Sequence, residues 1–378
     1  MGLMPLLILA ASNRAQAEKT DSSNKIQIAI LLDTSGSMEG LVNQARIQIW
    51  NIVDELTLAE RKGGKASIEI AVYQYGSSQV SKTTGFTKKI IDFTDDLDEV
   101  SRALFALSLA GGDEYCGEAI RQACDDLKWD PNAAYRAVFI AGNESFEQGQ
   151  TTFGSTLGRL SSKNIVVNTI YCKWKKAKKG EADQWRIAAQ LADGQSGRIN
   201  HNHHVSSRAT PYDSEFRNLN KRMNDSFVWY GSSAKKHRMN QIAQDKNASS
   251  ISNAAFAKRM SAKVGHLYKH VHSDLVDAIQ HGHVKMESMP ESKMPENLRE
   301  MSKQERMDYL NSKIEEREKV RREMATLIAK REKWLQANHS AGSQFTAETW
   351  GFAFVDAIKT QLASRGFQFA ETKIASSK

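Results

Sequence analysis

The sequence contains little cysteine and little proline, and it has no long apolar run. Its 378 residues include 3 cysteines and 5 prolines. Three cysteines can form at most one intramolecular disulfide, which excludes a small fold held together by several disulfides. So few prolines exclude collagen-like and proline-rich chains. No run of about 18 apolar residues occurs, so we expect no transmembrane span.

Common catalytic motifs are also missing. The chain has no Gly-x-Ser-x-Gly nucleophile turn, no His-Glu-x-x-His zinc motif and no Walker loop ending in Gly-Lys-Ser or Gly-Lys-Thr. A catalytic nucleophile needs a base and an orienting group, and no such set is recognisable. We therefore predict that the protein is not an enzyme. The enzymatic alternative that the motifs leave open is a metal-dependent hydrolase.

The composition is typical of a globular chain. Hydrophobic residues make up 40% and charged residues 25%, both near the averages for folded domains. The length predicts two or three domains, or one domain with a sizeable appendage. The 52 Lys and Arg residues exceed the 44 Asp and Glu residues by a net charge of +8. That excess is far smaller than in a dedicated nucleic-acid-binding protein, so we expect no nucleic-acid partner.

The N-terminus has the pattern of a secretory signal. An apolar run covers residues 3–11, and the small-x-small sequence Ala15-Gln16-Ala17 follows before the chain turns polar. The pattern predicts a signal peptide over residues 1–17, cleaved after Ala17. We therefore expect an exported protein, periplasmic or secreted, in a compartment where a disulfide can persist.

Strand and helix patterns alternate over the first 205 residues. Strand-like apolar or β-branched runs lie at residues 25–33, 67–75, 89–93, 136–141, 164–171 and 197–200. Apolar residues recur at helical spacing at residues 41–59, 97–107, 116–127 and 181–192. This alternation predicts an α/β fold, a doubly wound and mainly parallel sheet flanked by helices. We expect this domain to cover residues 24–230 and a helix at 214–227 to close it.

The rest of the chain is predicted to be mostly α-helical. Residues 231–295 have the pattern of a mixed helical and linker region, and residues 296–378 that of a charged helical C-terminal region. Apolar residues between 307 and 335 recur at a spacing close to that of a coiled coil, although Arg317, Arg321 and Arg331 interrupt the stripe. We expect these helices to serve as a spacer, as a brace or as a surface for self-association.

The first strand ends in a group of oxygen-bearing side chains. Asp33 is followed by Ser35 and Ser37, and in an extended turn residues at i, i+2 and i+4 can point the same way. Ligands of a parallel sheet bind at the carboxyl ends of its strands. A carboxylate with two hydroxyls is an oxygen-only donor set that suits a hard divalent cation, most simply Mg²⁺, with Ca²⁺ or Mn²⁺ as alternatives.

These residues resemble the metal-ion-dependent adhesion site (MIDAS) of the von Willebrand factor A family. The Asp-x-Ser-x-Ser motif stands between the first strand and the first helix, as it does in that family, and the resemblance covers about residues 25–205. It implies a Rossmann-like fold, a bound divalent cation and a protein ligand that presents an acidic or other oxygen group to the metal.

The chain departs from the family in the two other metal-binding loops. The family places a Thr in the second loop, whereas this chain offers Asp113 or Glu114, depending on the direction of counting. The family places an Asp in the third loop, where this chain has Gly142 and only Asn143 or Glu144 can substitute. An added carboxylate would tighten cation binding and weaken the demand for an acidic partner. Degenerate loops would instead leave a structural or scaffold protein with a fold that binds no metal.

Cysteine and histidine add one further prediction. Cys116 follows the second loop and Cys172 ends a predicted strand, so both are expected at the carboxyl edge of the sheet, and a Cys116–Cys172 disulfide is a candidate. Histidines cluster at residues 201–204, 270–272 and 281–283, but none stands at a recognisable spacing for a zinc site, so we expect loop histidines. The leading hypothesis is an exported, metal-dependent protein-binding module.

Overall fold

A computed structural model describes residues 22–200, 209–338 and 350–369 of the chain. The predicted signal peptide, residues 1–17, lies outside these ranges, as do His201, His203 and His204. Within the described ranges, no helix is both long enough and apolar enough to cross a membrane.

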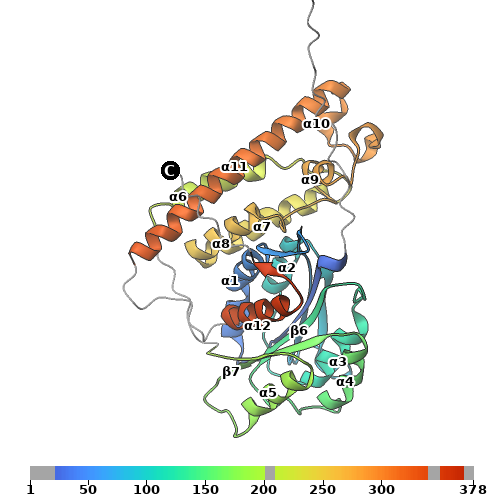
Figure 1. The fold of residues 1–378 in the computed structure, drawn as a ribbon, viewed down its shortest axis with the longest axis vertical. Coiled ribbons are helices and arrows are strands. Elements are labelled where there is room, and N and C mark those ends of the chain that lie inside the picture. Colours follow the sequence, from blue (N-terminus) through green and yellow to red (C-terminus); the bar gives the residue numbers. More distant parts are fainter. Residues whose placement is uncertain (1–21, 201–208, 339–349, 370–378) are drawn as a thin grey trace, which may run out of the picture.

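A six-stranded sheet forms the centre of the fold and confirms the predicted α/β class (Figure 1). Its strands in spatial order are β5 (Lys88–Thr94), β4 (Ser67–Tyr75), β1 (Lys25–Asp33), β6 (Tyr135–Gly142), β7 (Val166–Cys172) and β8 (Ser196–Ile199). All neighbours are parallel except β5, which pairs antiparallel with β4 at the edge. The strand order reverses beside β1, and doubly wound sheets bind their ligands at such a point.

The two faces of the sheet have separate apolar cores. Ile28 and Ile30 of β1 belong to one core, whereas Ala29 and Leu31 belong to the other, because successive strand residues point to opposite faces. The first core lies under α1 (Glu39–Leu56), α2 (Leu97–Phe105) and α12 (Trp350–Ser364), and the second under α3 (Cys116–Asp126), α4 (Leu157–Ser162) and α5 (Glu181–Leu191). Burial on both faces explains the unbroken apolar run of β1 from Ile28 to Leu32.

The last helix, α12, returns to the sheet. It packs on α1, β7 and β8, and Phe354 stacks on Phe139 of β6 with ring centroids 3.9 Å apart. The side chain of Gln44 accepts a hydrogen bond from the backbone of Trp350 at 2.9 Å. Nearby, β9 (Gln368–Phe369) joins β2 (Ala59–Arg61) and β3 (Gly64–Lys65) in a small second sheet. Elements from both ends of the described chain therefore build one domain.

The segment between β8 and α12 forms a helical body, residues 213–337. Its helices are α6 (Asp213–Asp225), α7 (Ala234–Ile251), α8 (Asn253–Val264), α9 (Leu275–Gln280), α10 (Glu296–Arg299) and α11 (Lys303–Ala337). The helix expected to close the sheet domain is α6, but it packs on α8 and α11 in a core of its own. Packing thus groups the elements differently from the predicted segments 24–230, 231–295 and 296–378.

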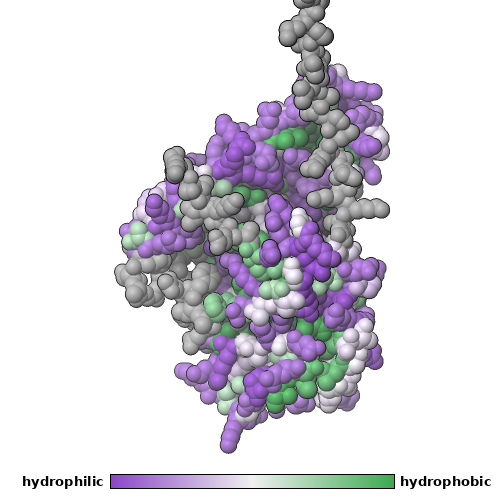
Figure 2. All heavy atoms as spheres, in the orientation of Figure 1, coloured by the Kyte–Doolittle hydropathy of each residue, from purple (hydrophilic) through white to green (hydrophobic). Residues whose placement is uncertain are grey.

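The long helix α11 buries arginines as well as apolar residues on its inward face. It begins with a capping box of Ser302 and Glu305, and its outward face is largely hydrophilic (Figure 2). Arg317 and Arg331, which seemed to interrupt the apolar stripe, lie on the inward face and are buried. Arg317 donates to Asp274 at 2.6 Å and to Asp277 at 2.7 Å. The helix α11 therefore packs against the other helices of the helical body through ion pairs as well as apolar contacts.

Candidate functional site

The turn from β1 into α1 is organised by Asp33. This side chain is fully buried, and its Oδ1 accepts a hydrogen bond from the backbone N–H of Ser35 at 2.8 Å. The hydroxyls of Ser35 and Ser37 lie 3.4 Å apart, and Thr34 anchors the turn by donating to the carbonyl of Tyr75 in β4 at 3.1 Å. Asp33 thus holds the turn together, while its other oxygen, Oδ2, has no hydrogen-bond partner.

The second loop brings Glu114 to this turn, not Asp113. Glu114 is buried, whereas Asp113 is exposed and accepts a hydrogen bond from Tyr115 at 3.1 Å. A Cβ atom added at Gly76 would lie 2.8 Å from Cγ of Glu114 and 2.9 Å from Oδ1 of Asp33. Both carboxylates therefore flank Gly76 just beyond the end of β4, and the positive φ of 76° at that residue also favours glycine.

The third loop contributes two side chains. Asn143 is buried and donates from Nδ2 to the hydroxyl of Ser37 at 3.1 Å. Glu144 is partly buried and accepts from Gln148 at 2.7 Å, and Gln148 also accepts from the backbone of Glu114 at 3.3 Å. Gln148, which we did not predict, therefore ties the second and third loops together. Its position in a turn beyond the strand gives no sequence signal.

Glycine is required at the place where the family has its Asp. A Cβ atom at Gly142 would lie 2.3 Å from the hydroxyl of Tyr75 and 3.2 Å from Cβ of Asp33. No larger residue fits there without displacing Tyr75, whose hydroxyl donates to the carbonyl of Ala141 at 3.0 Å. The polar side chains of this loop consequently come from the next two positions, Asn143 and Glu144.

Electrostatics at this site favour an added positive charge. Burial raises the pKa of Asp33 to about 7, partly offset by its hydrogen bonds with Ser35. Burial and the nearby charge of Asp33 raise the pKa of Glu114 to about 10. Oδ2 of Asp33, Oε2 of Glu114 and Oδ1 of Asn143 are all buried without a hydrogen-bond partner. Buried oxygens normally have partners, and three orphaned ones from three converging loops fit a divalent cation.

The predicted Cys116–Cys172 disulfide is not formed, and all three cysteines are free and buried. Cys116 belongs to the core on one face of the sheet and Cys172 to the core on the other. The two sulfurs contact different neighbours, the Tyr75 hydroxyl and the Ile170 carbonyl, each at 3.8 Å. The prediction was wrong because both residues lie near one edge but point to opposite faces.

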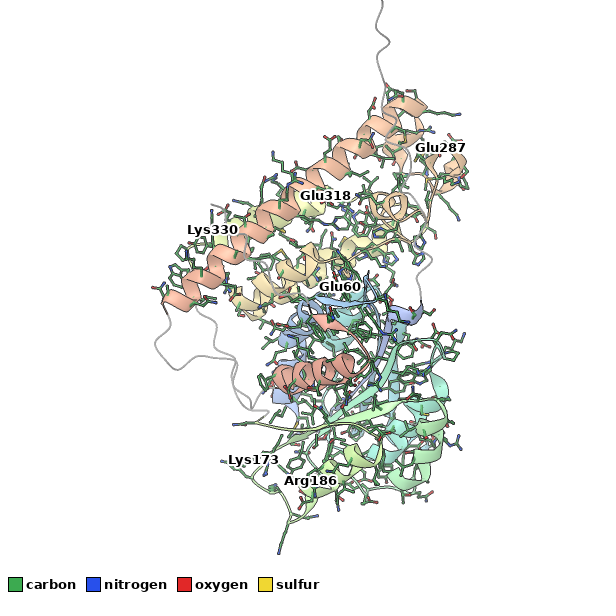
Figure 3. All side chains as sticks on the ribbon, viewed as in Figure 1. Glu60, Lys173, Arg186, Glu287, Glu318 and Lys330 are labelled. Carbon is green, nitrogen blue, oxygen red and sulfur yellow. The ribbon has the colours of Figure 1, made fainter. Side chains whose placement is uncertain are left out.

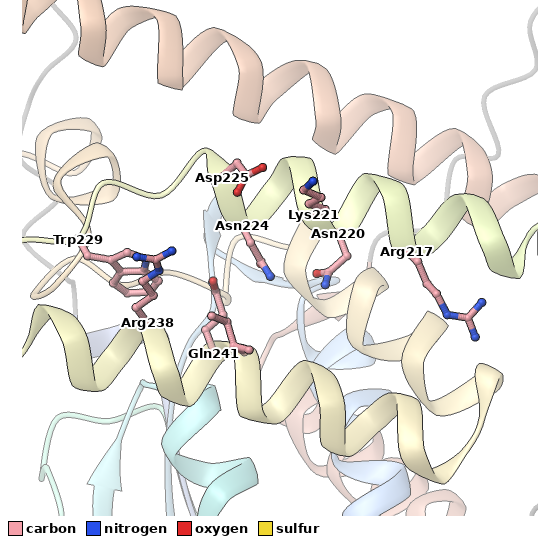
Figure 4. A pocket seen from close by; sticks show the side chains of 9 residues that line it. Arg217, Asn220, Lys221, Asn224, Asp225, Trp229, Arg238 and Gln241 are labelled. Atoms are coloured by element: carbon pink, nitrogen blue, oxygen red, sulfur yellow. The ribbon is translucent and has the colours of Figure 1, made fainter.

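A second polar hollow lies between α6 and α7 in the helical body (Figure 4). Its volume is about 280 Å³. The amides of Asn220 and Asn224 in its wall already donate to Asp245 at 2.9 and 2.7 Å. Because these polar groups are satisfied within the protein, the hollow lacks the unpartnered oxygens that mark the site around Asp33.

Comparison with known protein families agrees with the predicted fold. The model of the von Willebrand factor type A domain matches residues 27–181. The chain contains a von Willebrand factor type A domain. The match spans β1 to the start of α5 and includes all three loops around Asp33. We refer below to the sheet and the helices on its two faces as the A domain. No curated protein sequence matches the chain.

Several solved structures are similar to part of the chain, among them the following three. A von Willebrand factor type A protein from Catenulispora acidiphila shares 15% identity over 47% of this chain and 39% of its own, with a TM-score of 0.35. The SpRpn10 VWA domain shares 14% identity over 47% and 90%, with a TM-score of 0.34. Proximal thread matrix protein 1 of the mussel byssus, with a zinc-occupied MIDAS motif, shares 13% identity over 48% and 43%, with a TM-score of 0.35. The chain thus spans less than half of the first and the third.

Proposed function

We propose that the A domain binds a divalent cation and, through it, a protein partner. The residues that would hold the cation are Asp33, Ser35, Ser37, Glu114, Asn143 and Glu144. The observation that carries this proposal is the set of three buried oxygens, on Asp33, Glu114 and Asn143, that have no hydrogen-bond partner. A cation would supply the positive charge that these oxygens lack.

Mg²⁺ is the proposed ion because every donor is an oxygen. Asp33 and Glu144 offer carboxylates, Ser35 and Ser37 offer hydroxyls, and Asn143 offers an amide oxygen. Glu114 adds a carboxylate where the family has a neutral hydroxyl, so the site can also satisfy Ca²⁺, which accepts more oxygen ligands than Mg²⁺. Mn²⁺, which also binds octahedral oxygen sites, is a further alternative.

The open side of the site gives a partner access. Gly36 and Ser37 are exposed, whereas Asp33 and Ser35 are buried. A carboxylate or another oxygen from a protein partner can therefore approach from the side of Ser37. Figure 3 shows Lys173, which directly follows β7, at the end of the molecule away from α11, so this edge of the sheet is not covered by the helical body.

Titration calorimetry of the chelator-treated protein with Mg²⁺, Mn²⁺ and Ca²⁺ tests the cation. We expect binding by the wild type, none by Asp33→Asn, and wild-type binding by Asp113→Asn, a matched control because Asp113 neighbours the site but lies outside it. The absence of heat for the wild type, or equal heat for Asp33→Asn, contradicts the proposal. Partner capture from an envelope extract, with and without EDTA, then tests the protein ligand.

The second candidate function is a scaffold whose A domain binds no cation. It is favoured by the two departures from the family's metal-binding loops, Glu114 in the second loop and Gly142 in the third. Unchanged stability in EDTA, together with self-association that depends on the helical body, would support this candidate. For both candidates we propose an exported, non-enzymatic protein.

A further inference from the structure

We propose a second metal site, independent of the first, that holds a zinc-like ion at Asp96, Asp98, His237 and His270 and joins the helical body to the A domain. Asp96 caps α2, which follows the antiparallel strand β5. Because β5 runs antiparallel to β1, the residues that follow β5 lie at the end of the sheet where β1 begins. This second site is therefore at the opposite end of the strands from Asp33. His237 belongs to α7, and His270 lies between α8 and α9.

The ligand atoms have the spacing of a metal site. One ligand atom from each of Asp96, Asp98 and His270 lies within 4.8 Å of the others. Nδ1 of His237 is 3.3 Å from Oδ2 of Asp96. His270 faces the same oxygen with Nδ1 at 3.9 Å and Oδ2 of Asp98 with Nε2 at 3.6 Å, and one of these two nitrogens would bind the ion. Ligands around a tetrahedral Zn²⁺, at bonds of about 2.0–2.1 Å, are roughly 3.3 Å apart. Hydrogen bonds between nitrogen and oxygen are commonly shorter, about 2.7–3.2 Å.

The ring of His270, at the centre of the site, is buried, and its nitrogens make no hydrogen bond. The side chain of His270 is 2% exposed, and neither of its ring nitrogens has a hydrogen-bond partner. Its ring is held by edge contacts with Phe227, Trp229 and Tyr268, and its backbone N–H donates to Asp277 at 2.8 Å. A buried polar group without a partner is unfavourable, so an orphaned imidazole aimed at two carboxylates points to an absent ligand.

Each carboxylate keeps an oxygen for the ion. Oδ1 of Asp96 accepts from the backbone N–H groups of Asp98 and Glu99 at the start of α2, at 3.0 and 3.2 Å, which leaves Oδ2 for the site. Oδ1 of Asp98 is paired with Arg259 at 2.7 Å. Its Oδ2 accepts from the Tyr268 hydroxyl at 2.8 Å and has a second lone pair free to face His270.

The donor atoms of this second site favour a different metal from the one proposed at the first site. Two imidazoles and two carboxylates suit Zn²⁺ and similar borderline ions, whereas an oxygen-only set suits Mg²⁺. The ligands come from α2 of the A domain, from α7 and from the segment before α9, so the ion would tie three elements together. The Arg259–Asp98 pair already spans the same junction, so the protein is expected to fold without the ion and to gain stability when it binds.

The experiment uses the full chain carrying Asp33→Asn, which removes the first site. After chelation, the protein is titrated with ZnCl₂ in excess Mg²⁺ and followed by calorimetry, and Co²⁺ is bound in parallel and followed by its visible absorption. We expect one Zn²⁺ per chain, a tetrahedral Co²⁺ spectrum and a higher melting temperature with Zn²⁺. Adding His270→Gln or Asp96→Asn should weaken binding by about tenfold or more and abolish the Co²⁺ spectrum.

Two features of the design keep the result interpretable. Asn at position 96 can still cap α2, and His272→Ala is the matched control because His272 is exposed and two residues from His270. Circular dichroism and melting in EDTA check that each variant folds, and either of the two ligand variants suffices. The proposal is overturned if the Asp33→Asn protein binds no Zn²⁺, or if folded His270→Gln and Asp96→Asn proteins bind it as tightly as their parent.

Discussion

Replacing Arg259 tests what holds the helical body on the A domain. The Arg259 side chain is fully buried, and its guanidinium lies over Trp50 of α1, 4.6 Å from the ring centroid. It donates to Asp98 at 2.7 Å and to Asp245 at 2.6 Å. Asp98 belongs to α2 of the A domain, and Asp245 to α7 of the helical body. One cation therefore neutralises carboxylates on both sides of the junction.

The expected loss of stability in Arg259→Met depends on which partners remain for the carboxylates of Asp98 and Asp245. Asp245 keeps Lys263, at 2.8 Å. Asp98 keeps the neutral hydroxyl of Tyr268 as a hydrogen-bond donor and the His270 ring at 3.6 Å, but no Lys or Arg. Removing one partner of a buried ion pair costs about 3–5 kcal/mol, because it leaves a charge buried and unpaired. The methionine retains much of the packing over Trp50, so we assign the loss to Asp98.

Urea unfolding, followed by far-ultraviolet dichroism and by tryptophan fluorescence in EDTA, measures the effect. Arg102→Met is the control, since Arg102 pairs with Glu99 at 2.6 Å on the surface of the same helix α2, with 47% of its side chain exposed. We expect that change to cost about 0.5 kcal/mol. Adding Asp98→Asn to Arg259→Met should recover part of the loss. The reasoning is refuted if Arg259→Met costs no more than Arg102→Met.

Three further predictions concern the acid site, the last helix and the thiols. In EDTA, the free energy of unfolding of the wild type should fall relative to Asp33→Asn as the pH rises from about 4 to about 7. The reason is that the folded state keeps a proton on Asp33 up to a pKa of about 7, whereas the unfolded chain releases it near 3.8; parallel pH profiles would rule this out. Phe354→Ala should destabilise the protein by about 3–5 kcal/mol, since Phe354 is fully buried. The control is Phe352→Ala, which should have little effect because Phe352 is 41% exposed. Equal losses of stability in the two variants would show that α12 does not pack on the sheet. A thiol reagent should count three thiols in unreduced, denatured protein. It should react slowly with the native protein, because all three cysteines are buried. A count of one free thiol would instead show that two of the cysteines form a disulfide.

Local sequence patterns were sufficient to predict strands of the A domain. Strands were predicted at residues 25–33 and 67–75, and the structure has β1 and β4 at the same bounds. These strands are buried on both faces, so most of their residues are apolar or β-branched, and the pattern is readable in the sequence. The motif that follows β1 was likewise readable, because residues at the carboxyl end of a central strand must lie at the ligand edge of the sheet.

Loop conformation decided what the motif left open. Sequence alone permitted either Asp113 or Glu114 in the second loop, and only the folded loop shows that Glu114 turns inward while Asp113 stays exposed. The reason is that a loop without a repeating pattern has no fixed periodicity from which the direction of a side chain can be read.

Contacts between distant segments account for the remaining differences. The arginines of α11 resembled defects in an apolar stripe because their partners, Asp274 and Asp277 for Arg317, lie in another helix of the body. His270 lies in a loop, as predicted, but the sequence did not show that it faces Asp96 and Asp98, because these residues stand in a different part of the chain.

The sequence by itself determined the alternating strands and helices, the edge of the sheet that carries Asp33, Ser35 and Ser37, and the resemblance to the A-domain family. These depend on the period of apolar residues and on short-range turns, which neighbouring residues dictate. Only the tertiary structure decided that α12 closes the sheet, that Cys116 and Cys172 face opposite cores, and that His270 meets Asp96 and Asp98. Such pairings depend on which faces pack together, and that is set by the burial of the whole chain rather than by any single segment.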